Sequence, residues 1–352
     1  MQRSTISLII EELVQEGWVL EGATGRLPRG RRPTYLRLNE QRVIIGVDIR
    51  PIQTTVVLSD INGTFSAQDL FDTPADPAEA IRRIVASIER IRRTSGGKGR
   101  HKVEGIGVSV PGRFDSASDR LVFAPNLKWS NVDLRNPIAQ ATKLDVEIEN
   151  AANACVLAAI WFDGMESFRN LVVITVSEGI GSGILINGKI ASGLSGMAGE
   201  FGHVALDPAG PLCNCGGRGC WEVFGSNRAA LRYYHEATGN HSNLTFTDLL
   251  SLADSGDALA CEALEKMAHS LGKGMRMIVA GLAPERILIV GELTRSWNRF
   301  GPVIEAEVQS QALRGGSVPQ LIPVHEGGRA RLRGTVAMVL QKHFGEVAGN
   351  AV

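Results

Sequence analysis

A histidine followed closely by three cysteines is the feature that most restricts what this chain can fold into. The histidine ends the segment Gly199-Glu-Phe-Gly-His203, and the cysteines follow within the next seventeen residues. Thiolates and an imidazole can fill the four tetrahedral corners around a Zn²⁺ ion, and the glycines between the cysteines let the backbone turn around it. Because four protein ligands leave no corner for a reactive water, we predict a structural zinc site. The predicted ligands are His203, Cys213, Cys215 and Cys220.

The other cysteines and the composition narrow the kind of protein further. Cys155 and Cys261 stand alone in apolar stretches, so we expect two buried thiols. The alternatives for the cluster are a disulfide or four unrelated residues, but the cysteine usage favours a reducing cytoplasm. Acidic and basic residues number 37 each, so no global charge attracts nucleic acid or membranes. We expect no secretory signal and no membrane-spanning segment, because the apolar runs are short.

The spacing around the cluster resembles the signature of the ROK family, which groups repressors, open reading frames and sugar kinases. That signature is Glu-x-Gly-His, nine residues, and then Cys-x-Cys-Gly-x-x-Gly-Cys-x-Glu, and the resemblance extends from about Val43 to the C-terminus. It implies that one imidazole nitrogen of His203 meets zinc while the other faces a sugar hydroxyl. It also implies that Glu200 and Glu222 hold the sugar, and carboxylates are suited to accept hydrogen bonds from neighbouring hydroxyls.

Strands alternate with helices along the chain after residue 40, which predicts an α/β fold. The expected strands are Val43–Asp48, Thr54–Ser59, Gly105–Val110, Asp145–Glu149, Leu171–Val176 and Gly183–Ile186, and the expected helices are Pro77–Arg93 and Ala151–Phe162. The resemblance implies a two-lobed, actin-like (hexokinase-like) ATPase fold. We expect a small lobe at 41–150 plus about 337–352, and a large lobe at 151–336 that carries the zinc motif. A last helix, around 334–343, is expected to cross back to the small lobe.

The first forty residues have a different character. Apolar residues from Ile6 to Val14 fall at helical spacing, Gly17 follows, and two short strands at Val19–Leu20 and Tyr35–Leu38 flank an arginine-rich turn. This order resembles the second half of a winged helix-turn-helix, and a solvated basic linker is the alternative. The helix would reach base edges and phosphates in the major groove, and the wing would meet phosphates or a minor groove. The candidate DNA-binding residues are Arg3, Ser4, Thr5, Ser7, Arg26, Arg29, Arg31 and Arg32.

A complete domain of this type should begin with two further helices, and the sequence starts at the third. We therefore expect the apolar face of the first helix to be exposed. Either the start codon is misassigned or the domain is truncated. Double-stranded DNA is a partner if the helix-turn-helix is complete in the true gene product.

The position of the catalytic base differs from that of a sugar kinase. The family's Glu-Asn-Asp-x-Asn segment reads Glu149-Asn150-Ala151-Ala152-Asn153, so Ala151 stands where the aspartate belongs. Losing a general base typically costs roughly 10²–10⁴-fold in rate. Asn150 and Asn126 match sugar-side asparagines of the family, although each can also be a helix cap or turn residue. We predict no catalytic residue.

Both phosphate-binding loops also depart from the family pattern. Asp48-Ile49 is followed by Arg50 and Pro51 in place of glycines, and proline has no N–H to offer a phosphate. In the second loop Glu178 stands where threonine belongs, and a carboxylate repels a triphosphate. The adenine-side segment Ile287–Glu292 keeps a single glycine. Together with the missing base, the two altered phosphate loops make three separate losses.

The sugar side is intact and the ATP side is not, which predicts a sugar-responsive transcriptional regulator of the ROK repressor type. The alternatives are an ATP-dependent sugar kinase and a sugar-binding pseudokinase without DNA binding. We expect a homodimer or homotetramer in the cytoplasm, with a small sugar as effector. The expected sugar-binding residues are Asn126, Asn150, Glu200, His203 and Glu222.

Overall fold

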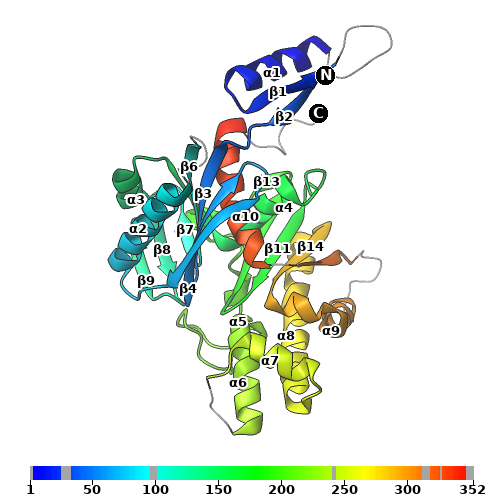
Figure 1. Cartoon of the computed structure of the whole chain (residues 1–352). Coiled ribbons are helices and arrows are strands. Elements are labelled where there is room, and N and C mark those ends of the chain that lie inside the picture. Colours follow the sequence, from blue (N-terminus) through cyan, green and yellow to red (C-terminus); the bar gives the residue numbers. More distant parts are fainter. Residues whose placement is uncertain are drawn as a thin grey trace.

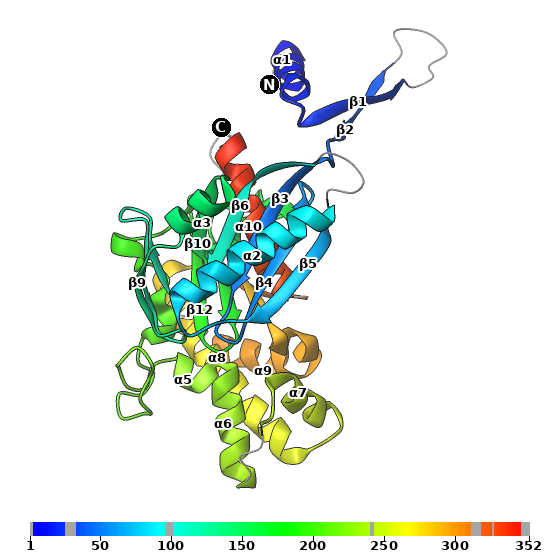
Figure 2. The same cartoon turned by 60° about the vertical axis from the view of Figure 1, so that its left-hand side comes forward.

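Two five-stranded sheets, one in each lobe, form the framework of the chain (Figure 1). The computed structural model describes residues 3–24, 33–95, 101–239, 243–310, 318–325 and 327–345. A small N-terminal module, made of the first helix and the first two strands, projects from the end of the two lobes (Figure 2). None of the helices in these ranges is both long and apolar enough to cross a membrane.

The small lobe is built on a mixed sheet with strand order β10-β6-β3-β4-β5. A second, three-stranded antiparallel sheet, β7-β8-β9, lies beside it. The strands are β3 (Arg42–Ile49), β4 (Gln53–Asp60), β5 (Phe65–Asp72), β6 (Lys102–Val110), β7 (Arg113–Asp115), β8 (Arg120–Ala124), β9 (Trp129–Val132) and β10 (Val146–Asn150). The helices are α2 (Pro77–Ser95) and α3 (Arg135–Thr142).

The large lobe is built on a sheet with strand order β13-β12-β11-β14-β15. Its strands are β11 (Leu171–Val176), β12 (Ile180–Ile186), β13 (Lys189–Ile190), β14 (Arg286–Gly291) and β15 (Gln320–Val324). Its helices include α5 (Glu222–Gly225), α6 (Asn227–Thr238), α7 (Phe246–Asp254), α8 (Ala258–Leu282) and α9 (Trp297–Gln309), with 3-10 turns η1 (Leu194–Gly196), η2 (Glu200–His203) and η3 (Glu292–Ser296). Helices α6 to α9 gather at one end of the molecule (Figure 1).

Sequence pattern explains the central strands of both lobes. Every residue of β3 is buried, as is every residue of β11, and each reads as a nearly unbroken apolar run. Such runs are typical of strands that are covered on both faces. Helix α2 instead is amphipathic and buries Ile84 and Ile88 against the small-lobe sheet. The predicted strands and helices after residue 40 are all confirmed, with ends shifted by a few residues.

Two helices, α4 (Ala151–Phe162) and α10 (Gly327–Phe344), pack against each other between the two sheets. Glycines permit their close approach. A Cβ atom on Gly334 of α10 would lie 2.1 Å from the carbonyl oxygen of Ala154 in α4. Gly107 of β6 likewise lets α10 approach the small-lobe sheet, since a Cβ there would lie 2.0 Å from the Thr335 carbonyl oxygen. Helix α10 contacts β3, β6 and β10, so the predicted return of the chain to the small lobe is confirmed. The helix begins at Gly327, earlier than the sequence pattern predicted.

The N-terminal module consists of α1 (Arg3–Gln15) and an antiparallel pair, β1 (Val19–Thr24) and β2 (Thr34–Leu38), in which Val19 opposes Leu38. The predicted hairpin is therefore confirmed. Ile6 and Ile9 on α1 are 45% and 41% exposed, as expected for a helix without partners on that face. Thr5 and Ser7 are exposed on the same helix, which also contains Arg3 and Ser4. Arg26, Arg29, Arg31 and Arg32 lie outside the described residues.

A buried tryptophan joins this module to the lobes. Trp18 is 4% exposed, and the Arg42 guanidinium lies 3.9 Å from its ring centroid. The rings of His343 and Phe344, at the end of α10, lie 5.0 and 4.7 Å from it. Arg42 also donates to the Gly17 carbonyl (2.9 Å) and pairs with Glu104 (2.7 Å). The first helix of the chain is thereby anchored to the last helix and to β3.

Candidate functional site

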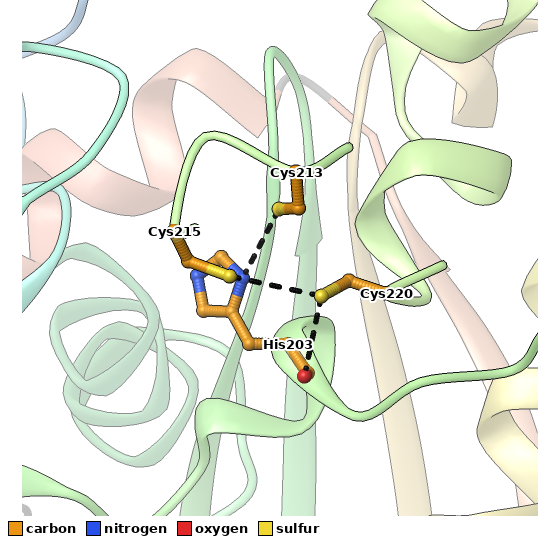
Figure 3. Close-up of side chains that lie close together, drawn as sticks. All are labelled: His203, Cys213, Cys215 and Cys220. Atoms are coloured by element: carbon orange, nitrogen blue, oxygen red, sulfur yellow. Dashed lines mark hydrogen bonds between the residues drawn. The ribbon is translucent and has the colours of Figure 1, made fainter. Parts of the chain in front are cut away.

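The predicted metal ligands come together at the start of the large lobe's helical region (Figure 3). His203 ends the 3-10 turn η2, and the three cysteines come from the loop that leads into α5. Their ligand atoms all lie within 4.8 Å of one another. The His203 Nδ1 atom is 3.6 Å from the Cys213 sulfur, and the sulfurs of Cys215 and Cys220 are 3.7 Å apart.

These separations suit a tetrahedral metal ion. Zinc–sulfur bonds of ~2.3 Å place two sulfurs about 3.8 Å apart at the corners of a tetrahedron. Burial raises the pKa of the Cys213 and Cys220 thiols, so keeping thiolates here requires a neighbouring cation. A metal ion would supply that charge. The cluster therefore has the donor set and the spacing for a metal ion.

The loop that carries the cysteines is closed by its own backbone. The Cys213 N–H donates to the Gly217 carbonyl (2.8 Å), and Leu212 and Arg218 face each other in an isolated β-bridge. Gly219 has φ +62°, and a Cβ there would lie 1.5 Å from the Asp207 carbonyl oxygen. Only glycine fits at that position, which is why the sequence can bring the cysteines back toward His203.

Beside the metal cluster, a cavity of about 90 Å³ lies between the lobes. It is lined by residues from β10, α4 and the β8–β9 loop of one side, and from β12, η2 and α5 of the other. The five residues predicted to bind sugar all line it, namely Asn126, Asn150, Glu200, His203 and Glu222. His203 is shared between cavity and cluster, with Nδ1 toward the sulfurs and Nε2 3.8 Å from a Glu200 oxygen.

The two glutamates are held in different ways. Glu222 is 6% exposed, and its Oε2 accepts a hydrogen bond from the Ile180 N–H (3.1 Å). Burial raises the pKa of Glu200, while His203 and Arg113 act to lower it. Both carboxylates retain oxygens that can accept further hydrogen bonds.

The two asparagines already have partners within the protein. Asn150 is the N-cap of α4, since its Oδ1 accepts from the Ala152 N–H (2.8 Å), and its Nδ2 donates to the Gly112 carbonyl. Asn126 Oδ1 accepts from Asn214 and Arg228. Each asparagine lines the cavity and keeps part of its hydrogen-bonding capacity.

The residue at the position of the catalytic base, Ala151, is the first residue of α4 and lines the same cavity. The carboxylates that line the cavity are Glu178, Glu200 and Glu222. Glu149, two residues before Ala151, is turned to the protein, where its Oε1 accepts from the Asn150 N–H (2.7 Å) and from Asn153 (3.1 Å).

The two altered phosphate loops contact each other across the cleft. An Arg50 Nη atom lies 3.2 Å from a Glu178 oxygen and 3.0 Å from a Glu292 oxygen. Burial alone would lower the pKa of Arg50, but the two carboxylates raise it above its ordinary value. From the sequence we interpreted Arg50 and Glu178 as two independent departures from the family pattern. That interpretation was wrong, because the two side chains form one ion-paired group. The formal charges are one positive and two negative, so the group is net negative by one.

A buried ion pair lies next to this partly exposed group. Arg331 of α10 donates to Asp48 (3.1 Å), and Ser109 donates to the other Asp48 oxygen (3.0 Å). Arg331 also lines the cavity. Sequence reasoning missed both Arg331 and the role of Glu292, since the partners are 283 and 242 residues apart and no local pattern links them.

The fold and the site together define a protein with the two-lobed architecture of a sugar kinase, an interlobe cavity and a cysteine–histidine metal cluster. The chain belongs to the ROK family, whose sequence pattern matches residues 44–342. It is 29% identical to the xylose repressor of Bacillus subtilis strain 168 over 346 residues, which cover 98% of this chain and 89% of the repressor. It is 31% identical to a glucokinase of Thermotoga maritima over 281 residues, which cover 75% of this chain and 87% of the glucokinase.

Solved structures of the family agree with the fold. A ROK family glucokinase from Streptomyces griseus, in complex with glucose and AMPPNP, aligns with a TM-score of 0.77 and 27% identity. That alignment covers 85% of this chain and 99% of the glucokinase. A ROK family transcriptional regulator, a homologue of the E. coli MLC protein, aligns with a TM-score of 0.80 and 23% identity over 99% of this chain and 92% of the regulator.

Proposed function

We propose that this protein is a transcriptional repressor that responds to a sugar and has lost kinase chemistry. The observation that carries the proposal is the contrast between the two sides of the cleft. The five sugar-side residues line one cavity, whereas the two phosphate loops are occupied by an ion-paired group of their own side chains.

In this proposal the sugar lies in the interlobe cavity. Glu200, Glu222 and the Nε2 atom of His203 hold its hydroxyls, and Asn126 and Asn150 contact it with the hydrogen-bonding capacity that their protein partners leave free. Zinc, held by His203 and the three cysteines, fixes the imidazole tautomer and orientation. A metal with four protein ligands keeps the site in shape and takes no part in a reaction.

Phosphoryl transfer fails here for electrostatic and steric reasons. Catalysis of this type relies on backbone N–H groups and cations placed around the phosphates. Here the Arg50 charge is already neutralised by Glu178 and Glu292, and the excess negative charge repels a triphosphate. Ala151 accepts no proton from a sugar hydroxyl.

The N-terminal module supplies the proposed DNA contacts. The alignment with the xylose repressor leaves 2% of the chain uncovered, which is about 7 of 352 residues, so it includes most of the first forty. The glucokinase of Thermotoga maritima matches 75% of the chain. We assign the DNA contacts to Arg3, Ser4 and the exposed Thr5 and Ser7 at the start of α1, and to the arginines of the turn.

Sugar binding would alter DNA affinity by favouring one lobe arrangement, and only to the extent that it binds that arrangement more tightly. In a dimer, helix spacing must match the half-site spacing on DNA, so small rotations matter. The anchor around Trp18 ties α1 to the end of α10 and so provides the physical connection.

DNA binding measured by fluorescence anisotropy tests this function. Fragments enriched from random duplexes by the purified protein serve as the probe, and D-xylose, D-glucose and N-acetylglucosamine are added in turn. We expect one sugar to change the affinity for DNA, and Glu222→Gln to abolish that change while DNA still binds. No enrichment of any duplex would favour a sugar-binding pseudokinase.

The second candidate, an active sugar kinase, is favoured by the glucokinases among the relatives. Release of ADP in the presence of a hexose and Mg-ATP would support it. We expect none.

A further inference from the structure

Asn126 of the small lobe contacts the metal loop, which is the segment 213–220 that carries the three cysteines. It lies in the turn between β8 and β9, and its Oδ1 accepts two hydrogen bonds from the large lobe. Asn214 Nδ2 donates at 2.8 Å and Arg228 Nη1 donates at 2.9 Å. A carbonyl oxygen has two lone pairs, so these two donors saturate it.

Arg228 sets the orientation of the Asn126 amide. An arginine has donors only, so the amide must turn its oxygen toward Arg228 and its NH₂ away. The Nδ2 atom then points toward the cavity, where a Cβ on Gly179 would lie 2.9 Å from it and 2.2 Å from Glu222 Oε2. Asn126 therefore presents a donor, and not an acceptor, beside a glutamate that faces the same cavity.

Asn214 is positioned by the metal cluster. It stands between two predicted ligands, Cys213 and Cys215, in the loop that the Cys213–Gly217 hydrogen bond closes. A bound metal would fix the backbone on both sides of it. Arg228 is positioned independently, in the first turn of α6, which Ser226 caps.

We propose that Asn214 and Arg228 are positioning residues that clamp Asn126 across the cleft, so that the metal loop holds the sugar cavity closed and sets which amide atom the sugar meets. The proposal rests on the sugar-binding role proposed above for the cavity. Neither residue belongs to the sugar or metal residues that the family resemblance implies. When the lobes separate, both hydrogen bonds must break, because donors and acceptor lie on different lobes.

The first test measures sugar binding. Dissociation constants for D-xylose and D-glucose are measured by calorimetry for Asn214→Ala, Arg228→Ala and Arg228→Lys. Loss of one hydrogen bond at this exposed position corresponds to about 5- to 10-fold weaker binding. We expect that loss for both alanine variants, partial recovery for the lysine variant, and unchanged zinc content in all three. Arg218→Ala is the matched control, since it removes an arginine from the loop that carries Asn214, and Arg218 donates to the Gly210 carbonyl and not to Asn126.

A double-mutant cycle with Asn126→Ala separates the clamp from a general effect on the surface. If the contacts act through Asn126, Arg228→Ala has no further effect once Asn126 is alanine. Full additivity of the two changes would overturn the clamp, as would unchanged affinity in both alanine variants.

The second test needs no sugar, so it distinguishes failure of the clamp from failure of the proposed function. Amide hydrogen exchange is followed in residues 124–129 of the sugar-free protein before and after zinc is removed with a chelator. We expect faster exchange there after zinc removal, although this segment contains none of the predicted metal ligands. In Asn214→Ala/Arg228→Ala, exchange should be fast from the start and insensitive to the chelator. Exchange in wild type that ignores zinc would refute the clamp even if sugar binds.

Discussion

At the scale of single residues, two substitutions in the phosphate loops matter more as a pair than separately. Arg50 would attract a phosphate if it stood alone, and Glu178 would repel one. Arg50 lies 3.2 Å from Glu178, and Glu292 contacts the same guanidinium nitrogen, so the Arg50 charge is already paired with two carboxylates. Ala151, which stands where we expect the family's aspartate, lines the adjoining cavity.

Restoring the base alone should not restore turnover. In Ala151→Asp a carboxylate returns to the start of α4, but the ion-paired group still fills the phosphate loops. We expect no ADP release above background with D-glucose and Mg-ATP in a coupled assay. The combined variant Ala151→Asp/Arg50→Gly/Glu178→Thr is assayed in parallel for comparison. Turnover in the single variant would show that the loops still accept ATP.

Removing Arg50 should destabilise the protein. Arg50→Ala leaves Glu178 and Glu292 facing each other without a cation, and we expect the free energy of unfolding to fall by about 1–3 kcal/mol in urea. Arg295 is exposed and lines a neighbouring cavity, so Arg295→Ala is the control. It should change the free energy of unfolding little.

The stability that the Arg50–Glu292 ion pair contributes has a defined pH dependence. Burial raises the pKa of Glu292, but Arg50 and other contacts lower it overall below its ordinary value. A carboxyl whose pKa is lowered by folding adds stability above the ordinary value of about 4.3, and that stability is lost as pH falls through the lowered pKa. The difference between wild type and Arg50→Ala should therefore shrink in acid. A difference that stays constant as the pH falls into the acid range would contradict this origin.

At the scale of elements, the metal loop and helix α10 carry the connections between distant parts of the chain. The loop at 213–220 brings ligands to η2 and a donor to the β8–β9 turn, and α10 runs from the Arg331–Asp48 pair near the cavity to the rings packed on Trp18. One end of α10 therefore lies at the cleft, and the other packs against the N-terminal module.

Breaking the metal cluster should abolish the sugar response together with metal binding. Cys213→Ser removes one thiolate, and we expect the zinc content to fall from one ion per chain toward zero and sugar affinity to fall with it. Elemental analysis and calorimetry measure the two quantities. Cys261→Ser, a buried thiol far along the chain in α8, should keep its zinc. A zinc-free protein that binds sugar normally would break the link.

Elements with a strong local signal could be predicted from sequence, and contacts between distant elements could not. Helix α4 was predicted with its observed ends because a run that is apolar except at Asn153 follows the capping Asn150. The ligand cluster was predictable because its spacing is short. The Arg50–Glu178 pair spans 128 residues and two lobes, and the Arg331–Asp48 pair spans 283 residues, so neither contact follows from local periodicity.

At the scale of the whole molecule, the chain keeps the two lobes of a sugar kinase and ties them together with its own side chains. Arg50 links the lobes on the phosphate side, and Asn126 links them on the side of the metal loop. The cavity between these ties is lined by the sugar-side residues. In the proposed function, closure depends on sugar and metal and needs no nucleotide.

Calorimetric titration of the full chain with a panel of D-xylose, D-glucose and N-acetylglucosamine, with and without Mg-ATP, tests this central claim most directly. We expect one sugar to bind with a dissociation constant that Mg-ATP leaves unchanged, and Mg-ATP alone to give no binding heat. Tighter sugar binding in the presence of Mg-ATP, or heat from sugar-dependent ATP turnover, would contradict it.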